Sequence, residues 1–215
     1  MTVEAKERTD AEVAQARQAN RVRGLHHFAI GTTKMAETKA FYTGIVGLPH
    51  TQTWREEFPA GPNGPMKYMH CFFELGDGSA LAFFQFAEGH RRAPEKLPRE
   101  VFDHHIALRL DNTDEVIAMR DKLKAAKLPC AVIDHGYCYS LYTRDPNGML
   151  VEFAADPDGT DELFAEKARN ADVELATWLS GDLAPGNFHR SYEGAQLPVS
   201  PLEEIAAVAI PPEHQ

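Results

Sequence analysis

A short pattern of paired histidines occurs twice in this chain, and this repetition limits the folds that the chain can adopt. Residues 25–30 (LHHFAI) match residues 103–108 (DHHIAL). Each copy reads as a short strand that begins with the histidine pair, and a segment with helical spacing follows it. Further strand-like segments follow each helix. The sequence therefore predicts a βαβββ unit that is present in tandem.

The same repetition singles out three residues that could bind a metal ion. His27 and His105 occupy matching positions in the two copies, and an alanine two positions on leaves space on the same strand face. The second copy ends in a turn, residues 145–148 (DPNG), which leads into a strand with one carboxylate, Glu152, among apolar residues. A buried lone carboxylate needs a cation or hydrogen bonds. These three residues are predicted metal ligands; the alternative for the histidines is a hydrogen-bonded strand histidine.

The patterning divides the chain into four parts and predicts the α+β fold class. We expect an N-terminal helical arm, a first βαβββ module with its linker, a second βαβββ module, and a C-terminal helix and tail. The parts are residues 1–22, 23–100, 101–157 and 158–215.

Three local expectations follow from the composition of single segments. Residues 34–46 have helical spacing, and Gly47 is predicted to end that helix. Residues 58–65 contain three prolines and two glycines and are predicted to form a loop. The last 35 residues have no convincing periodicity, so we expect a wrapping or partly disordered tail.

The overall composition narrows the classes of function and the compartment. The net charge of −10 argues against a nucleic-acid partner, because phosphate binding needs a basic surface. No apolar run reaches the length of a membrane span, and the polar N-terminal residues do not resemble a signal peptide. Cys71, Cys130 and Cys138 form no CxxC pair, which favours free, packed thiols in a reducing, cytoplasmic compartment.

Taken together, these segments resemble the vicinal oxygen chelate superfamily, which includes glyoxalase I, fosfomycin- and bleomycin-resistance proteins and type I extradiol dioxygenases. The resemblance spans roughly residues 23 to 155. It implies a half-open mixed β barrel, formed by the two modules around a divalent metal ion, with extra helical segments at both ends. The matching pieces are residues 25–30, 41–42, 47–48, 104–108, 142–148 and 152–153.

The resemblance also implies the metal set. His27 and His105 match the first-strand ligands of the two modules, and Glu152 matches the last-strand ligand of module two. The fourth position, at the end of module one, falls near Gln85, which would serve as a ligand in a lyase-like site. A His-His-Glu set is the facial triad of non-haem Fe(II) oxygenases, so Fe(II) is the expected metal, with Mn, Zn or Ni as alternatives.

Further residues are candidates for contacts with the substrate. The resemblance to extradiol dioxygenases places a substrate-contacting tyrosine at about Tyr142; the alternative is a half-buried strand tyrosine. His135, in a loop, is a candidate acid–base catalyst, or a polar loop residue. Arg109 would bind a substrate carboxylate or pair with an acidic side chain at the rim. His70 and Phe83 are further candidates for the lining of the substrate site.

Three functions remain open at this point. The leading hypothesis is an Fe(II) extradiol-type dioxygenase that acts on a catechol-like or other vicinal-oxygen small molecule together with O₂, although many ring-cleaving relatives carry four modules. The second is a lyase or isomerase of glyoxalase type, or a thiol transferase of fosfomycin-resistance type. The third is a metal-free binding protein of bleomycin-resistance type. A homodimer is expected because homodimers are common among relatives.

Overall fold

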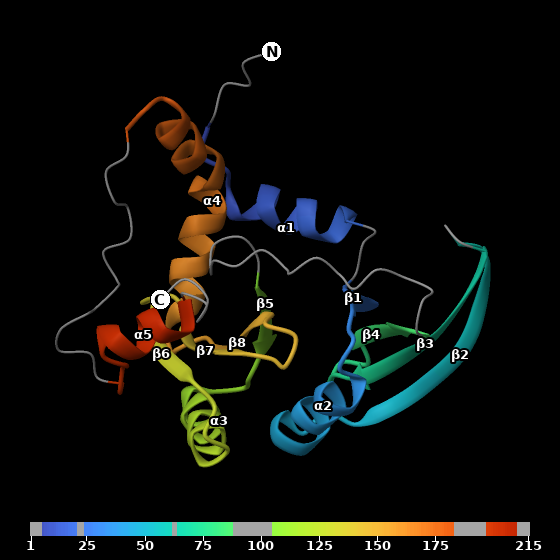
Figure 1. Ribbon diagram of the computed structural model, residues 1–215. Helices are drawn as coiled ribbons and strands as arrows, with labels where there is room; N and C mark the ends of the chain where they lie inside the picture. The colour runs from blue at the N-terminus through green and yellow to red at the C-terminus, as the bar shows by residue number, and fades with distance from the viewer. Residues whose placement is uncertain (1–5, 21–23, 62–63, 88–104, 183–196, 210–215) are drawn as a thin grey trace.

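The computed structural model describes residues 6–20, 24–61, 64–87, 105–182 and 197–209. Its main body consists of two four-stranded sheets, one from each copy of the repeat (Figure 1). The strand orders are β1-β4-β3-β2 and β5-β8-β7-β6. In each sheet the first strand is parallel to its neighbour, and the remaining pairs are antiparallel. The predicted α+β fold with two βαβββ modules is therefore confirmed.

The elements follow one another in the same order in both modules. Module one contains β1 (His27–Gly31), α2 (Met35–Lys39), the π-helix η1 (Ala40–Val46), β2 (His50–Gly61), β3 (Gly64–Glu74) and β4 (Ala80–Phe86). Module two contains β5 (Ile106–Arg109), α3 (Thr113–Ala125), β6 (Cys130–Asp134), β7 (Tyr139–Arg144) and β8 (Leu150–Ala155). Outside the modules lie α1 (Asp10–Ala19), α4 (Thr160–Leu179) and α5 (Leu202–Ala209).

The helix of module one begins and ends close to the prediction but changes its type along the way. It starts as α2 and continues as the π-helix η1. π-Helices are rare in proteins, and those that occur are often found at functional sites. Gly47 ends it in the left-handed conformation (φ 95°), which favours glycine, and its N–H donates to the carbonyl of Tyr42. Tyr42 itself is completely buried.

The loop predicted for residues 58–65 is wrong. Residues up to Gly61 belong to β2 and residues from Gly64 belong to β3, with Phe58 paired to Met66 and Gly61 paired to Gly64. A register shift lies between Phe58 and Gly61. Prolines are tolerated here because β2 is an edge strand and because β4 pairs with β3 only from Tyr68 onward.

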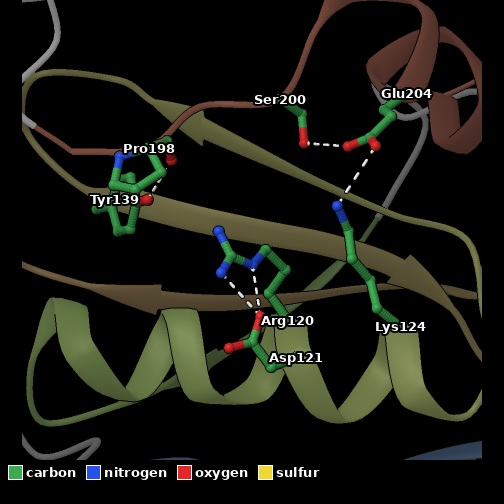
Figure 2. Close-up of polar contacts among 7 residues, drawn as sticks. All are labelled: Arg120, Asp121, Lys124, Tyr139, Pro198, Ser200 and Glu204. Atoms are coloured by element: carbon green, nitrogen blue, oxygen red, sulfur yellow. Dashed lines mark hydrogen bonds and ion pairs between the residues drawn. The ribbon is translucent and has the colours of Figure 1, made fainter.

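The tail expected to wrap around the protein or to be partly disordered packs on module two, and its residues 202–209 form the helix α5, which the sequence did not predict. Val208 is buried and packs in one apolar cluster with Ala131, Tyr142 and Leu150 of module two. Figure 2 shows how the preceding segment is attached: Ser200 donates to Glu204, and Glu204 pairs with Lys124. Tertiary packing therefore stabilises a helix that is too short to show a periodic signal.

One apolar core is common to both modules. Tyr42 and Phe73 of module one belong to the same buried cluster as Leu123, Val132 and Phe153 of module two. In module one this core lies between the sheet and α2–η1, and in module two between the sheet and α3. The two modules consequently fold around one core, and on the opposite face of the module-two sheet α5 packs against Ala131, Tyr142 and Leu150.

Helices α1 and α4 pack against each other above the sheets (Figure 1). Thr9 and Glu12 form the capping box at the start of α1, where the sequence of residues 9–12 (TDAE) itself suggests an N-cap. Arg169 joins the two helices through an ion pair of 2.7 Å with Asp10. Within the described residues α1 buries no side chain and α4 buries only Thr160. None of the described helices is both long and apolar enough to cross a membrane.

Tyr139→Phe is expected to loosen the C-terminal attachment. The buried Tyr139 hydroxyl donates to the carbonyl of Pro198, and its loss should lower the free energy of unfolding by about 1 kcal/mol. Burial raises the pKa of Tyr139 from 10.0 to about 12, so wild-type stability should fall as the pH rises through this window, because only the unfolded chain ionises there. Urea unfolding at pH 7, 10 and 12 measures both effects.

Part of this alkaline loss should be missing in Tyr139→Phe, because the variant has no phenol at this position. An equal loss of stability between pH 10 and pH 12 in both proteins would contradict the assignment.

Candidate metal centre

The central pair of the candidate site lies in module two. His105 directly precedes β5, and Glu152 lies in the middle of β8, where it is paired in register with Ala107. The His105 Nε2 and Glu152 Oε2 atoms are 3.0 Å apart. Glu152 is only 5% exposed. The structure therefore brings together two of the three predicted ligands, one from just before the first strand and one from the last strand of the module.

The second carboxylate oxygen of Glu152 has a partner on the neighbouring strand. Ser140, completely buried in β7, donates its hydroxyl to Glu152 Oε1 over 2.5 Å. A buried carboxylate is costly unless hydrogen bonds or cations balance it. Ser140 and His105 together fix the orientation of the carboxylate. No sequence pattern pointed to Ser140, because an isolated serine in a strand carries no signal.

Tyr142 and His135 lie beside this carboxylate and contact each other. The Tyr142 hydroxyl is 3.0 Å from His135 Nε2, and Tyr142 is paired in register with Glu152. Burial, followed by the negative charge of Glu152, raises the pKa of Tyr142 well above its ordinary value. The phenol consequently keeps its proton and acts as a hydrogen-bond donor. Both residues were predicted separately, and the fold joins them in one pair.

A cysteine that was predicted to be a packing residue completes a second set of donors. One potential ligand atom from each of His135, Cys138 and Glu152 lies within 4.8 Å of the other two. Cys138 is partly buried, and burial raises the pKa of its thiol. All three cysteines are free, as predicted. A His/Cys/Glu set can bind a divalent metal ion, and its soft sulfur favours zinc-like ions.

His27 lies on module one with a different set of neighbours. Its ring is 5.8 Å from the ring of His70 and 5.4 Å from that of Phe72, and its Nδ1 is 2.7 Å from Nδ1 of His26. His27 is exposed and falls outside the group of donor atoms around Glu152. The structure thus describes two half-sites, one with His27 and one with His105 and Glu152.

His70 provides an independent indication of a ligand on the module-one face. Its ring stacks on Phe84 at 3.7 Å, and among the described residues its buried Nε2 has no hydrogen-bond partner. Burial, and then the nearby His27, lower the pKa of His70, so the ring is held neutral. A neutral imidazole with an unused buried nitrogen is suited to a polar ligand group. This observation, together with the donor types around Glu152, fits a bound divalent metal and a polar substrate.

Three other predicted residues lie away from these half-sites. Arg109 is mostly exposed and pairs with Asp156 at 3.3 Å, which is the rim ion pair given as its alternative. Phe83 is 1% exposed in the common core, in ring contact with Tyr42. Gln85 accepts a hydrogen bond from the backbone of Met35 over 2.9 Å. The placements favour structural roles for all three, because strand alternation turns Phe83 and Gln85 toward the helix and the core.

The internal repeat identifies the module-one counterpart of Glu152 more securely than the sequence could. Ala107 is paired with Glu152, and Ala29, its counterpart, is paired with Ala82. The turns before β4 and β8 lead to the same residue. Gly78 and Gly148 both adopt φ 84° and are therefore equivalent, and Ala82 follows Gly78 at the distance at which Glu152 follows Gly148. The fourth ligand position is therefore Ala82 and not Gln85. The alanine side chain at this position offers no donor atom.

The family of this chain follows from a comparison with known sequences. A family model described as the Glyoxalase/Bleomycin resistance protein/Dioxygenase superfamily matches residues 24–153. Because this match covers more than half of the chain, the protein belongs to that superfamily. Its members bind small molecules, and the resemblance read from the sequence is confirmed.

Two relatives carry dioxygenase names. Biphenyl-2,3-diol 1,2-dioxygenase 3 of Rhodococcus globerulus is 25% identical over 162 residues, which cover 66% of this chain and 71% of the relative. Biphenyl-2,3-diol 1,2-dioxygenase 2 of the same organism is 34% identical over 100 residues, which cover 41% of this chain and 53% of the relative. The second match thus spans about half of that relative.

Solved structures with a similar fold have varied titles. Lactoylglutathione lyase from Agrobacterium tumefaciens is 23% identical with a TM-score of 0.45, and covers 63% of this chain and 96% of that one. A glyoxylase/bleomycin resistance protein/dioxygenase domain from Frankia is 13% identical with a TM-score of 0.49, and covers 64% and 95%. Both scores lie below 0.5, so no property of these proteins is transferred to this chain.

Glu152→Gln is expected to weaken binding of Mn(II) to the metal-free protein by about 100-fold or more, because removing a charged ligand costs at least as much as removing a partner of a ligand. The amide keeps the side-chain volume and a hydrogen bond to Ser140. Calorimetric titration measures the affinity, and Glu37→Gln on the exposed side of α2 serves as the control. Equal affinities in Glu152→Gln and the wild type would exclude this carboxylate as a ligand.

Proposed function

We propose that this protein is an Fe(II)-dependent dioxygenase of extradiol type, which acts on a catechol-like small molecule with two adjacent oxygen atoms. The observation that carries this proposal is Ala82 at the module-one counterpart of Glu152. With His27, His105 and Glu152 as ligands, the set is two histidines and one carboxylate. Such a facial triad leaves coordination positions open for substrate and O₂.

His27, His105 and Glu152 would hold the metal in this proposal. Bound iron would orient the two reactants and lower the pKa of a coordinated substrate hydroxyl. Ser140 keeps the Glu152 carboxylate oriented through the hydrogen bond of 2.5 Å. This partner matters because the loss of a group that orients a ligand typically lowers metal affinity about 10- to 100-fold.

The proposed proton chemistry belongs to residues around the triad. His135 would take or return a substrate proton, with the Tyr142 phenol as its partner at 3.0 Å. His70 would accept a hydrogen bond from the substrate through its Nε2, which has no partner among the described residues. Phe72 and Phe84, in ring contact with His70, would form an apolar wall for an aromatic ring.

The length of this chain is compatible with the proposed activity. Many ring-cleaving relatives carry four modules, whereas this chain has two. The matched segment is 66% of this chain and 71% of biphenyl-2,3-diol 1,2-dioxygenase 3, so that relative has a similar length. A dioxygenase name on a chain of this size supports the proposal, and the substrate class remains part of it.

A metal-dependent lyase or thiol transferase is the second candidate. The observation in its favour is the His135, Cys138 and Glu152 group, whose donor types suit zinc better than Fe(II). In that function His27 would not be needed as a ligand. The metal that copurifies with the protein separates the two candidates.

The decisive experiment is metal analysis of anaerobically purified protein, followed by O₂ uptake with Fe(II) and a panel of catechols. We expect about one iron per chain and catechol-dependent O₂ uptake, because the triad has three ligands and open positions. His105→Ala should lose both, while His50→Ala on the edge strand β2 should retain both. Bound zinc without O₂ uptake would overturn the dioxygenase proposal in favour of the second candidate.

Ala82→Glu tests the open coordination position directly. A carboxylate at this position is expected to strengthen metal binding and to reduce O₂ uptake, because a fourth protein ligand would occupy a site needed by a reactant. Ala82→Leu controls for the added bulk in this buried strand. If metal affinity is the same in both variants, Ala82 does not face the metal.

A further inference from the structure

The turn between β7 and β8 joins the two modules. It comprises residues 145–148 and follows the β7 strand that carries Ser140 and Tyr142. The Lys34 ammonium, from module one, donates to the carbonyl of Pro146 over 3.2 Å. The other inter-module hydrogen bonds described for this turn involve its two polar side chains, Asp145 and Asn147.

Asn147 bonds to two threonines of module one. The Thr32 hydroxyl donates to Asn147 Oδ1 over 2.6 Å, and Asn147 Nδ2 donates to the Thr38 hydroxyl over 3.1 Å. Both threonines are buried, at 4% and 0% exposure. Their hydroxyls are also bound to the backbone of Lys34, one accepting from its N–H and the other donating to its carbonyl. Donors and acceptors are matched throughout, which favours one defined geometry.

Asp145 stabilises the conformation of the turn by accepting hydrogen bonds from within the turn and from module one. Its Oδ1 accepts from the N–H groups of Asn147 and Met149, and its Oδ2 accepts from Asn147 Nδ2. The hydroxyl of Tyr42, in η1, donates to Oδ2 over 3.2 Å. Asp145 is 5% exposed, so these four donors balance the cost of burying a carboxylate. The turn is therefore rigid as well as anchored.

The anchoring points lie at equal sequence distances from the predicted ligands. Thr32 follows β1 directly, and its N–H still donates to the carbonyl of Phe84 in the neighbouring strand. His27 lies as many residues before Thr32 as Asn147 lies before Glu152. The bond between Thr32 and Asn147 joins the strand of one half-site to the strand of the other.

We propose that Asn147 is a positioning residue, which sets the separation of the two half-sites through its bonds to Thr32 and Thr38. This inference rests on the proposed function only in assigning His27, His105 and Glu152 to one metal. The bonds that the structure describes for Asn147 go to Thr32, Thr38 and Asp145, and none of them goes to a proposed ligand. It acts by fixing where β8, and so Glu152, stands relative to β1.

The equivalent turn of module one supplies the matched control. The backbone bond from Leu75 to Ser79 closes this turn as the bond from Asp145 to Met149 closes the other, so Asp77 occupies the position of Asn147, midway between the bonded residues. The Asp77 carboxylate accepts hydrogen bonds only from Ser79 among the bonds that the structure describes for it. The two turns thus share a backbone conformation and differ in whether the side chain crosses to the other module.

The test compares Mn(II) affinity of the metal-free protein in Thr32→Val, Thr32→Ser, Asn147→Ala and Asp77→Ala. Thr32→Val removes the hydroxyl with little change of volume, and Thr32→Ser keeps the hydroxyl but loses a methyl group. We expect Thr32→Val and Asn147→Ala to weaken affinity by about 10-fold or more. Thr32→Ser and Asp77→Ala should stay near the wild type. Thermal unfolding identifies any variant that fails to fold.

The pattern across the two threonine variants decides between positioning and packing. If Thr32→Ser weakens affinity more than Thr32→Val, the residue acts through packing and the proposal is overturned. Wild-type affinity in both Thr32→Val and Asn147→Ala would overturn it as well. If the wild type binds Mn(II) but shows no catechol-dependent O₂ uptake, the proposed function fails, while these affinities still judge the positioning role.

Discussion

The burial of the Glu152 carboxylate is the constraint on which the rest of the site depends. A negative charge that is 5% exposed, between apolar neighbours on β8, must be balanced by partners. Ser140 balances one oxygen, and His105 lies against the other. Burial, and then the same charge, raise the pKa of Tyr142 and keep the phenol protonated. One carboxylate on β8 therefore organises a hydroxyl and a phenol of β7 and an imidazole just before β5, and an added divalent cation would complete the balance.

The duplication explains the architecture, and the differences between the copies carry the chemistry. Both modules keep the same strand order, the same turn and the same histidine. They differ at two pairs of equivalent positions: the second module has Glu152 where the first has Ala82, and Asn147 where the first has Asp77. In the proposed site module one would contribute an aromatic face and the imidazoles of His27 and His70, while module two would contribute the carboxylate and its partners. A symmetric fold thus supports an asymmetric site.

The terminal helices contribute in ways that the family match does not cover. The matched residues end at 153, but α5 places Val208 against Tyr142 and Leu150 on module two. This helix therefore packs on the sheet face to which Tyr142 belongs. On the other end of the molecule, α4 leaves Leu175, Trp178 and Leu179 exposed. The functional part of module two is consequently stabilised by residues that lie far away in sequence.

The sequence alone determined the βαβββ duplication, the His105 and Glu152 pair and the capped start of α1, because each depends on short-range patterns of side chains. Only the tertiary structure decided that residues 58–61 continue an edge strand, that α5 forms, and that Ala82 stands where Gln85 was expected. These outcomes depend on strand register and on packing between distant segments. A shift of one residue in register turns a side chain to the opposite face of a sheet, and no local pattern records that choice.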